Sequence, residues 1–353
     1  MRVDEFSFQL PDELIAQTAV PRGTSRLLNL SRETGAVLHG QIGDLPGMLR
    51  AGDVLVVNDT RVFAARLLGR RVPSGGAVEC LLLGAPIDRA PDGSARFEAL
   101  VHPGQKLKPG AQVRFDGPAG GIDGEILERR FFGRRIVRLI PDHGQTLDDL
   151  VDAIGHVPLP PYIHRGDETA DRERYQTVYA RDRGSVAAPT AGLHFTPELL
   201  EAIADRGVIR AAVTLHVGYG TFQPIRTDLV EQHVVDPEPY EITEETAAVI
   251  AIARAERRRV IAVGTTTTRA LEDAARRGDG VIRAGRAQAD IFIHPGFRFQ
   301  VIDGLLTNFH LPGSSLLMLV CAFAGRERVL AAYEEAVRER YRFYSYGDAM
   351  LIL

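Results

Sequence analysis

The sequence predicts an α/β main domain, with alternating strands and helices and a mixed sheet, into which a small antiparallel β-barrel domain is inserted. The chain has 353 residues, more than one average domain, and its 45% apolar and 25% charged residues are ordinary for a globular protein. Strand-like and helix-like stretches alternate in the second half, which is typical of an α/β layer. We therefore expect the α/β domain in residues 1–60 and 146–353 and the barrel in residues 61–145.

The first α/β segment contains a buried-strand pattern at Val54–Val57, and Asn58-Asp59 then favours a turn. The barrel region follows. Its apolar runs AVECLLL, ARFEALV, AQVRF and RRIVRLI are short, and clusters such as PSGG, APDGS and KPG separate them. This region has no convincing helical stretch, so it predicts a small antiparallel sheet or barrel.

After the barrel, the stretch TLDDLVDAIG predicts a helix ended by Gly155, and a proline-rich crossing follows it. A second helix should begin at Pro197 behind the N-cap Thr196 and end at Gly207. The remaining predicted elements are strands at 209–217 and 260–263, helices at 244–257 and 269–277, and a buried apolar segment at 316–324.

Charge, cysteine content and the N-terminus limit the class of protein. The net charge of −4 argues against a protein coated in positive charge but permits a local basic stripe. Cys80 and Cys321 are far apart, which fits a reduced compartment rather than a disulfide framework or a structural zinc. The N-terminus lacks the apolar run of a signal peptide, and the segment 316–324 is too short to span a bilayer. We expect a cytoplasmic protein with no membrane partner.

Four stretches combine a small or glycine-rich backbone with a hydroxyl group or a histidine at the end of an element. They are PTAGLHF (189–195), LHVGYGTFQP (215–224), VGTTTTRALE (263–272) and LLTNFHLPGSS (305–315). Two of them follow predicted strands directly. Ligands of α/β sheets bind outside the carboxyl ends of the strands, so these stretches predict a binding site there.

The stretch VGTTTTRALE runs from a strand through glycine into a helix. Free N–H groups at a helix start, together with hydroxyls, suit a carboxylate, a ribose or a phosphate, although the P-loop spacing is absent. An ordinary threonine-capped turn explains the same pattern equally well. In HVGYGTF, Gly218 and Gly220 allow close approach of backbone to a ligand, but a bulge with His216 in the core is an open alternative.

Other chemistries have weaker support. No H-x-x-x-H or H-E-x-x-H spacing occurs, so we expect no metal site, and no G-x-S-x-G serine elbow is present. The stretch ERRFFGRRIVR (128–138) predicts a hairpin that either grips a nucleic-acid backbone or is a solvated arginine-rich hairpin over a phenylalanine core. The terminal aromatic cluster YRFYSYGDAM could stack bases, but core packing is the better interpretation.

Taken together, NDTRV, APTAGLHFT, TLHVGYGTFQP, RVIAVGTTTTRALE, TNFHLPGSSLLMLV and YRFYSYGDAMLI resemble, in order and spacing, the S-adenosylmethionine:tRNA ribosyltransferase-isomerases of queuosine biosynthesis. FQLPDELIAQTAVPRGTSRLL and IGHVPLPPYI match as well, so the resemblance covers nearly the whole chain. It implies transfer and isomerisation of the ribosyl part of S-adenosylmethionine onto 7-aminomethyl-7-deazaguanine at the wobble position of tRNA. The products are epoxyqueuosine-tRNA, adenine and methionine. S-adenosylmethionine is then a consumed substrate, and no recycled cofactor is expected.

The resemblance also implies site residues. Histidine suits proton transfer near neutral pH, so we expect His194, His216 and His310 to line one pocket and at least one of them to act as acid or base. Arg269 and Thr265 are expected to anchor the methionine carboxylate or the ribose. The full expected substrate-binding set is Arg61, Pro189, Thr190, Ala191, Gly192, Phe195, Gly218, Gly220, Thr221, Phe222, Gly264, Thr265, Thr266, Arg269, Asn308 and Tyr346.

The chain departs from the family pattern at four positions, which weakens any catalytic role there: Asp236, Thr267, His294 and His102. Two other functions stay open at the sequence level. An ordinary methyltransferase that uses S-adenosylmethionine should show a G-x-G-x-G loop after its first strand, which is not visible. A non-enzymatic RNA-binding module would be built around the β insertion.

Overall fold

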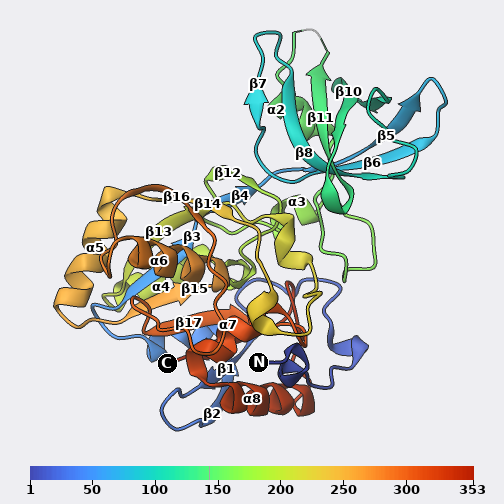
Figure 1. Cartoon of the computed structure of the whole chain (residues 1–353). Coiled ribbons are helices and arrows are strands. Elements are labelled where there is room, and N and C mark those ends of the chain that lie inside the picture. The colour runs from blue at the N-terminus through green and yellow to red at the C-terminus, as the bar shows by residue number, and fades with distance from the viewer. Residues whose placement is uncertain (143) are drawn as a thin grey trace.

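A strand from the first segment of the chain lies among strands from the second half. β3 (Val54–Asn58) pairs in parallel with β13 (Ile209–Leu215) on one side and with β15 (Val260–Val263) on the other. β17 (Gly304–Asn308) extends the parallel set beyond β15. In this computed structural model, which describes residues 1–142 and 144–353, the expected α/β domain is confirmed (Figure 1).

Antiparallel strands complete the large sheet on both sides of the parallel centre. The nine-stranded order is β16-β14-β13-β3-β15-β17-β18-β1-β2. β14 runs antiparallel to β13, and β18 runs antiparallel to β17, so the sheet is mixed. The outer strands are β14 (Glu238–Ile242), β16 (Gly285–Ala289), β18 (Ala349–Ile352), β1 (Arg26–Leu30) and β2 (Val37–Gln41).

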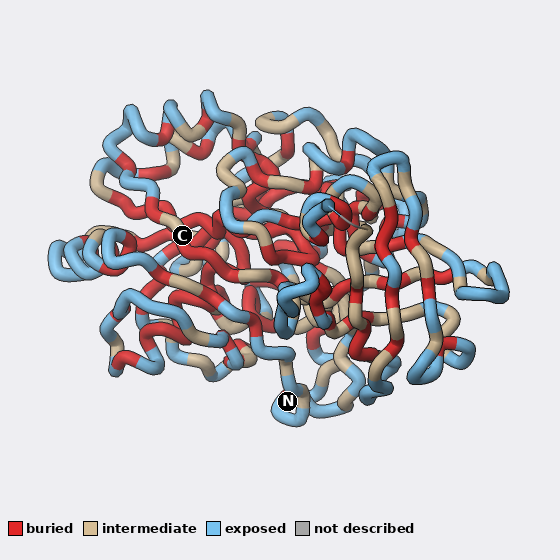
Figure 2. The backbone as a smooth tube through the Cα atoms, turned by 90° about the horizontal axis from the view of Figure 1, so that it is seen from above, coloured by how far each residue is buried: buried red, intermediate tan, exposed pale blue. Residues whose placement is uncertain are grey.

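Helices cover both faces of this sheet because successive side chains of its central strands point to opposite faces. In β3, Val54 and Val56 pack in one core, whereas Leu55 and Val57 pack in the other. The first core includes side chains of α5, α6, α7 and α8, and the second includes those of α1 and α4. Buried backbone accordingly runs through the middle of the molecule, and exposed backbone marks the outer turns (Figure 2). The helices are α1 (Leu45–Met48), α4 (Pro197–Asp205), α5 (Glu244–Ala255), α6 (Thr265–Arg277), α7 (Ser315–Ala324) and α8 (Arg326–Arg338).

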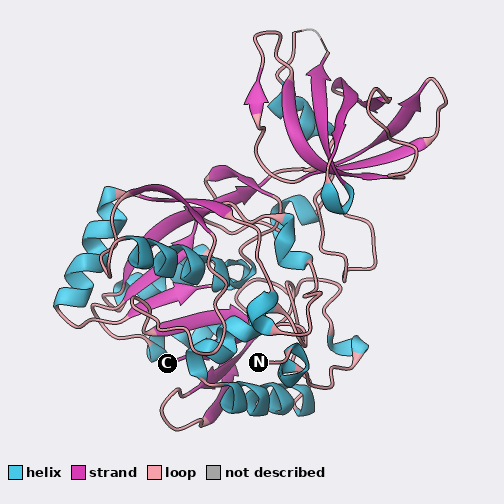
Figure 3. Ribbon diagram, viewed as in Figure 1, coloured by secondary structure: helices cyan, strands magenta, loops and turns pink. Residues whose placement is uncertain are grey.

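The expected barrel is present as a separate antiparallel sheet (Figure 3). Its strands pair in the order β11-β10-β9-β5-β6-β8-β7, and an additional β11–β8 pairing closes the ring. The helix that follows, α2 (Leu147–Ile154), packs its buried side chains into the barrel core rather than onto the large sheet. The strands are β5 (Arg66–Val72), β6 (Ala77–Leu82), β7 (Asp88–Arg89), β8 (Ala95–His102), β9 (Gln112–Gly117), β10 (Gly120–Arg129) and β11 (Arg134–Pro141).

Short elements connect the two parts. β4 (Thr60–Val62) and β12 (Asp182–Ser185) form a two-stranded sheet near the junction of barrel and α/β domain. The 3₁₀ turns η5 (Thr190–His194) and η6 (Tyr219–Phe222) lie in two of the stretches that sequence analysis singled out. The other short elements are α3 (Asp171–Arg174), η1 (Val3–Phe6), η2 (Asp12–Leu14), η3 (Ile42–Asp44), η4 (Phe131–Gly133) and η7 (Val230–Gln232).

One helix begins earlier than the sequence predicts. α6 starts at Thr265 rather than at Arg269, so the four threonines form its first turn. Gly264 has a φ of 90°, a conformation that favours glycine, and it turns the chain directly from β15 into the helix. Its N–H donates to the Leu306 carbonyl oxygen at 2.7 Å, which fixes this turn to β17.

Candidate functional site

The carboxyl ends of the four parallel strands meet at one edge of the large sheet. The segments that follow β3, β13, β15 and β17 therefore lie together, as the position of the sequence motifs predicts. Asn58 joins three of them: its amide Nδ2 donates to the Leu215 carbonyl oxygen at 2.9 Å and to the Thr266 hydroxyl at 3.3 Å. Two neighbouring pockets open at this edge.

Pocket B, with a volume of about 550 Å³, lies against the ends of β15 and β17. Its wall combines hydroxyl groups, small residues and aromatic rings. The first turn of α6 contributes N–H groups that the helix itself does not use. The lining residues are Tyr162, Ala187, Ala188, Pro189, Thr190, Ala191, Val217, Thr221, Phe222, Gly264, Thr265, Thr266, Thr307, Asn308, His310, Leu316, Tyr344 and Ser345.

His310 and Asn308 are the chemically distinctive members of pocket B. The His310 ring is buried, its Nε2 lies 2.8 Å from the Thr307 hydroxyl oxygen, and its backbone N–H donates to the Tyr333 hydroxyl at 3.1 Å. Burial lowers the pKa of His310 to about 3, so the imidazole is neutral at physiological pH. Asn308 donates through Nδ2 to the Tyr344 carbonyl oxygen at 2.9 Å, and its Oδ1 is buried.

His194 lies behind the wall of pocket B. Its Nδ1 is 2.9 Å from the Ser25 hydroxyl, and Asn308 is close enough to influence its protonation. The Nε2 atom is also buried. Burial lowers the pKa of His194 to about 4. Asn308 opposes the fall in this pKa through a side-chain hydrogen bond, so His194 Nε2 and Asn308 Oδ1 are partners of each other rather than free groups.

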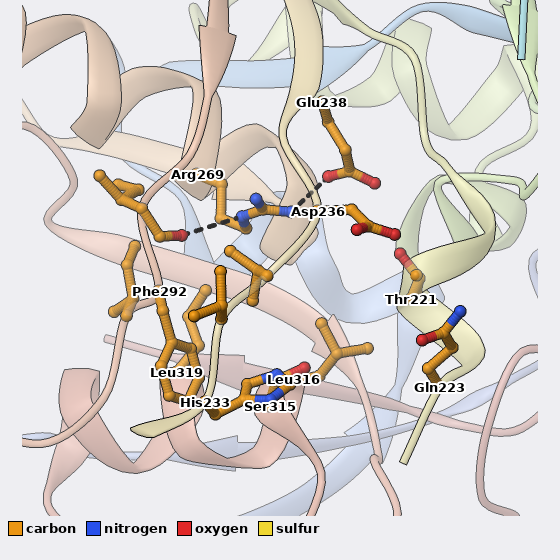
Figure 4. A pocket seen from close by; sticks show the side chains of 15 residues that line it. Thr221, Gln223, His233, Asp236, Glu238, Arg269, Phe292, Ser315, Leu316 and Leu319 are labelled. Carbon is orange, nitrogen blue, oxygen red and sulfur yellow. Dashed lines mark hydrogen bonds and ion pairs between the residues drawn. The ribbon is translucent and has the colours of Figure 1, made fainter. Parts of the chain in front are cut away.

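Pocket A has a volume of about 630 Å³ and shares two lining residues with pocket B. Charged side chains line it (Figure 4). Arg269 of α6 forms an ion pair with Glu238 and donates to the Ala289 carbonyl oxygen at 2.9 Å. Burial raises the pKa of Glu238, although Arg269 opposes the shift. The lining residues are Gly220, Thr221, Gln223, His233, Val234, Val235, Asp236, Glu238, Arg269, Ile291, Phe292, Ile293, Ser315, Leu316 and Leu319.

The two pockets share Thr221 and Leu316, so they are neighbours with one wall in common. Thr221 belongs to η6, which follows β13, and Leu316 belongs to the first turn of α7. A ligand that extends over this shared wall contacts a charged pocket at one end and an aromatic, hydroxyl-rich pocket at the other. An elongated molecule with a zwitterionic end and a planar end matches this division.

The barrel reaches the rim of pocket A. Arg134, at the start of β11, forms an ion pair with Asp236 at 2.5 Å. Asp236 was expected to be a weak candidate for catalysis, and its position in the pocket wall with an arginine partner supports a structural or binding role instead. The second domain thus contributes directly to the surroundings of the site.

The structure brings together many, but not all, of the residues that the sequence predicts. Pocket A or B is lined by Pro189, Thr190, Ala191, Gly220, Thr221, Phe222, Gly264, Thr265, Thr266, Arg269, Asn308 and His310. Gly218 lies directly behind this lining, with its N–H donating to Glu238 at 2.8 Å. Gly192 packs against Tyr179 and Thr177, where a Cβ atom has no room, and Phe195 is buried in the core below.

Three expected residues lie elsewhere among the described residues. The His216 ring packs against Gly184, and its Nδ1 lies 2.8 Å from the Thr60 hydroxyl, so the expectation that all three histidines line one pocket is not met. Val217, the next residue, is the one that contributes to the lining of pocket B. Arg61 is the exposed residue of β4, between the buried Thr60 and Val62, and lies outside both pockets.

Tyr346 is buried with its hydroxyl donating to Asp171 at 2.9 Å, in agreement with the core alternative for the terminal cluster. Apart from Asp236, the positions at which the chain departs from the family pattern lie outside both pockets. The Thr267 hydroxyl donates to the Val263 carbonyl oxygen at 2.7 Å, His102 is exposed, and the His294 Nδ1 lies 3.0 Å from the Pro295 carbonyl oxygen.

Sequence reasoning missed several lining residues. Glu238 is a buried carboxylate at the start of β14, but the strand EPYEI also contains Glu241, so the sequence alone did not single Glu238 out. Tyr344 lies in the aromatic cluster that was assigned mainly to the core. Tyr162 ends the proline-rich crossing, whose rings the sequence alone could not place.

Residues 1–142 and 144–353 contain no helix with the length and apolarity needed to cross a bilayer. They also contain no group of three or more His, Cys, Asp or Glu side chains that could hold a metal ion. Cys80 and Cys321 are buried free thiols.

The fold and the site define a two-part α/β protein with a joined pair of small-molecule pockets at the strand ends and a barrel at their rim. Comparison with known proteins then places it: residues 3–352 match the model of the queuosine biosynthesis protein family, and the chain belongs to this family. Proteins from Heliobacterium modesticaldum and Moorella thermoacetica, 52% and 50% identical with full coverage of both chains, are named S-adenosylmethionine:tRNA ribosyltransferase-isomerase.

A solved structure agrees with these relatives. The S-adenosylmethionine tRNA ribosyltransferase from Thermotoga maritima, whose crystal structure is known, is 38% identical in sequence to this chain. The two structures match with a TM-score of 0.54, and the match covers 99% of this chain and 100% of the Thermotoga chain. The names of these relatives give no support to the methyltransferase or the non-enzymatic alternative.

Proposed function

We propose that this chain transfers and isomerises the ribosyl part of S-adenosylmethionine onto 7-aminomethyl-7-deazaguanine at the wobble position of tRNA. The products are epoxyqueuosine-tRNA, adenine and methionine. Family membership and the names of full-length relatives support the activity. The observation that carries it at the level of the site is the joining of pockets A and B at Thr221 and Leu316.

S-adenosylmethionine matches the two pockets in charge and shape. Its methionine end carries a carboxylate, an ammonium and the sulfonium. Pocket A offers Arg269 to the carboxylate and Asp236 or Glu238 to the cationic groups. The planar adenine suits the aromatic rings of pocket B, where the second lone pair of Asn308 Oδ1 can accept from its amino group. The ribose then lies at the shared wall, within reach of the Thr265 end of α6.

Proton transfer falls to His310 in this arrangement. The sulfonium acidifies the hydrogens on the ribose 5′ carbon, and a base must remove one of them to form an ylide. Burial keeps the His310 imidazole neutral, which leaves a ring nitrogen that can accept a proton, but the lowered pKa makes it a weaker base than a solvent-exposed histidine. Departure of adenine is eased by protonation of its ring, and a protonated His310 or the aminomethyl nitrogen of the incoming base can supply this proton. His194 supports Asn308 from behind the pocket.

The experiment that tests the proposal is a product analysis. The protein is incubated with S-adenosylmethionine and with tRNA that carries 7-aminomethyl-7-deazaguanine, and free adenine and methionine are measured. The proposal predicts one adenine and one methionine for each modified tRNA, and none with tRNA that carries guanine at the wobble position. Formation of S-adenosylhomocysteine, or no turnover with the substrate tRNA, would reject it.

A further inference from the structure

The hairpin between β10 and β11 presents two phenylalanine rings at the end of the barrel. Phe131 is 87% exposed and Phe132 is 81% exposed, more than any other large apolar side chain described apart from Val234. Large aromatic rings rarely remain in water without a function, and a cluster of them on a surface marks an interaction site. The core alternative for these phenylalanines is therefore wrong, because neither ring is buried.

The backbone at this tip holds an unfavourable conformation. Phe132 has a φ of 54° and a ψ of 34°, in the left-handed region that bulky side chains avoid. Glycine or asparagine would adopt this backbone conformation with a lower conformational free energy. Strained backbone conformations cluster at functional sites.

Cations surround the two rings. Arg129 and Arg130 precede them and are exposed, and the Arg226 guanidinium lies 5.8 Å from the centre of the Phe132 ring. Arg129 forms no ion pair with any residue of the described chain, whereas Arg130 has only Glu128 at 3.4 Å. The negative overall charge of the protein is thus locally reversed at this end of the barrel.

A second basic loop is held at the same end. The buried Arg135 donates to the carbonyl oxygens of Gly104 at 2.9 Å and Leu107 at 3.3 Å, which ties the loop after β8 to the base of the hairpin. This loop contributes the exposed Lys106 and Lys108. Arg135 therefore builds the surface from inside rather than gripping a ligand itself.

The tip also has a fixed position relative to the site. Arg134, two residues after Phe132, forms the ion pair with Asp236 in the wall of pocket A. The tip is therefore held beside the rim of pocket A. Exposed rings for stacking, with arginine and lysine for phosphates, are the recognition chemistry of unpaired nucleotides.

We propose that the hairpin tip, Arg129–Arg130–Phe131–Phe132 together with Arg226, is the surface that holds the tRNA substrate beside the pockets. This inference rests on the proposed function. Phe131 and Phe132 stack on unpaired bases next to the wobble nucleotide, and the cations of the tip and of the loop with Lys106 and Lys108 contact the flanking phosphates.

The test compares steady-state kinetics and binding of an anticodon stem-loop RNA for wild type and three variants. In Phe131→Ala/Phe132→Ala we expect the KM for tRNA to rise at least about tenfold, since base stacking contributes substantially to binding. The KM for S-adenosylmethionine and kcat at saturating tRNA should stay within about twofold. Arg129→Ala/Arg130→Ala should weaken RNA binding and lower the slope of log affinity against log salt by about 2.

The Phe132→Gly variant distinguishes a loss of RNA binding from a loss of folding stability. Glycine accepts the φ of 54°, so this variant should keep or raise the melting temperature while its RNA affinity falls. The matched controls are Leu38→Ala, a 66% exposed apolar residue on edge strand β2, and Arg283→Ala, an exposed cation before β16.

Wild-type RNA affinity in all three tip variants would overturn the inference, as would equal losses in the controls. If the tip binds a protein instead of RNA, all three tip variants will keep wild-type RNA affinity. Absence of adenine release by the wild-type enzyme would reject the proposed function itself, which is a separate outcome.

Discussion

The guanidinium of Arg134 in the barrel lies 2.5 Å from the carboxylate of Asp236 in the wall of pocket A. This contact joins the inserted domain to the site that the strand ends of the α/β domain form. The Arg134 and Asp236 side chains are 23% and 47% exposed, so the pair contributes less than about 1 kcal/mol to stability. The main effect of this ion pair is to hold the hairpin tip of the barrel at the rim of pocket A.

The first prediction concerns this contact. Arg134→Gln should leave the melting temperature almost unchanged but raise the KM for tRNA several-fold, because the hairpin tip loses its fixed position at the pocket rim. Thermal unfolding and steady-state kinetics measure the two effects. A variant that turns over as wild type with an unchanged KM for tRNA would show that the ion pair is a surface contact without function.

The second prediction concerns the buried ion pair in pocket A. Arg269→Met should raise the KM for S-adenosylmethionine about tenfold or more, because the carboxylate loses its cation. It should also cost about 3 kcal/mol of stability, because Glu238 is left buried and unpaired. The double variant Arg269→Met/Glu238→Gln should regain the stability of the wild type but not its affinity for S-adenosylmethionine. Full affinity for S-adenosylmethionine in either variant would exclude Arg269 as the carboxylate anchor.

The third prediction separates the histidines. His310→Asn should lower kcat by about 10²-fold to 10⁴-fold, as expected for loss of a general base, with a smaller effect on the KM for S-adenosylmethionine. His216→Asn should lower kcat less than about tenfold, because its ring lies against Gly184 outside both pockets. Melting temperatures establish that both variants are folded. The opposite order of the two losses would return the proton-transfer role to His216.

The fourth prediction is a pH dependence of stability. Burial lowers the pKa of His310 to about 3 and that of His194 to about 4, from 6.5. Below pH 6.5 the unfolded chain therefore binds more protons than the folded one, and stability falls as the pH falls toward these values. Each histidine removes about 1.4 kcal/mol per pH unit in this window.

Thermal unfolding between about pH 7 and pH 5 measures the effect, and His310→Asn should make the decline shallower than in wild type. His164→Asn, at an exposed position, is the control and should not change the decline. Equal slopes for wild type and His310→Asn would mean that His310 becomes protonated in the folded protein.

Much of the fold follows from local patterns. The alternation of strands and helices after the barrel, the caps at Thr196 and Gly207, and the buried strand at 260–263 each depend on neighbours in sequence. Closure of the barrel through the β8–β11 pairing depends on contacts distant in sequence, and no local pattern encodes it. The packing of α2 on the barrel core is likewise a tertiary effect.

The site was predictable in so far as it follows from topology. Parallel strands bring Thr265, Asn308 and His310 to one edge, and a motif that directly follows such a strand carries this information. The direction of a side chain at a strand end does not follow in the same way. Val217 contributes to the lining of pocket B, whereas the neighbouring His216 ring lies against Thr60 and Gly184, and pattern alone could not decide between them.

The most direct test of the account is a crystal structure of the protein with S-adenosylmethionine bound. We expect adenine in pocket B beside Asn308 and His310, the methionine end at Arg269 in pocket A, and the ribose at Thr221 and Leu316. S-adenosylmethionine bound away from this edge of the sheet, for example in the groove between α4 and β13 that Leu200 and Arg210 line, would contradict it.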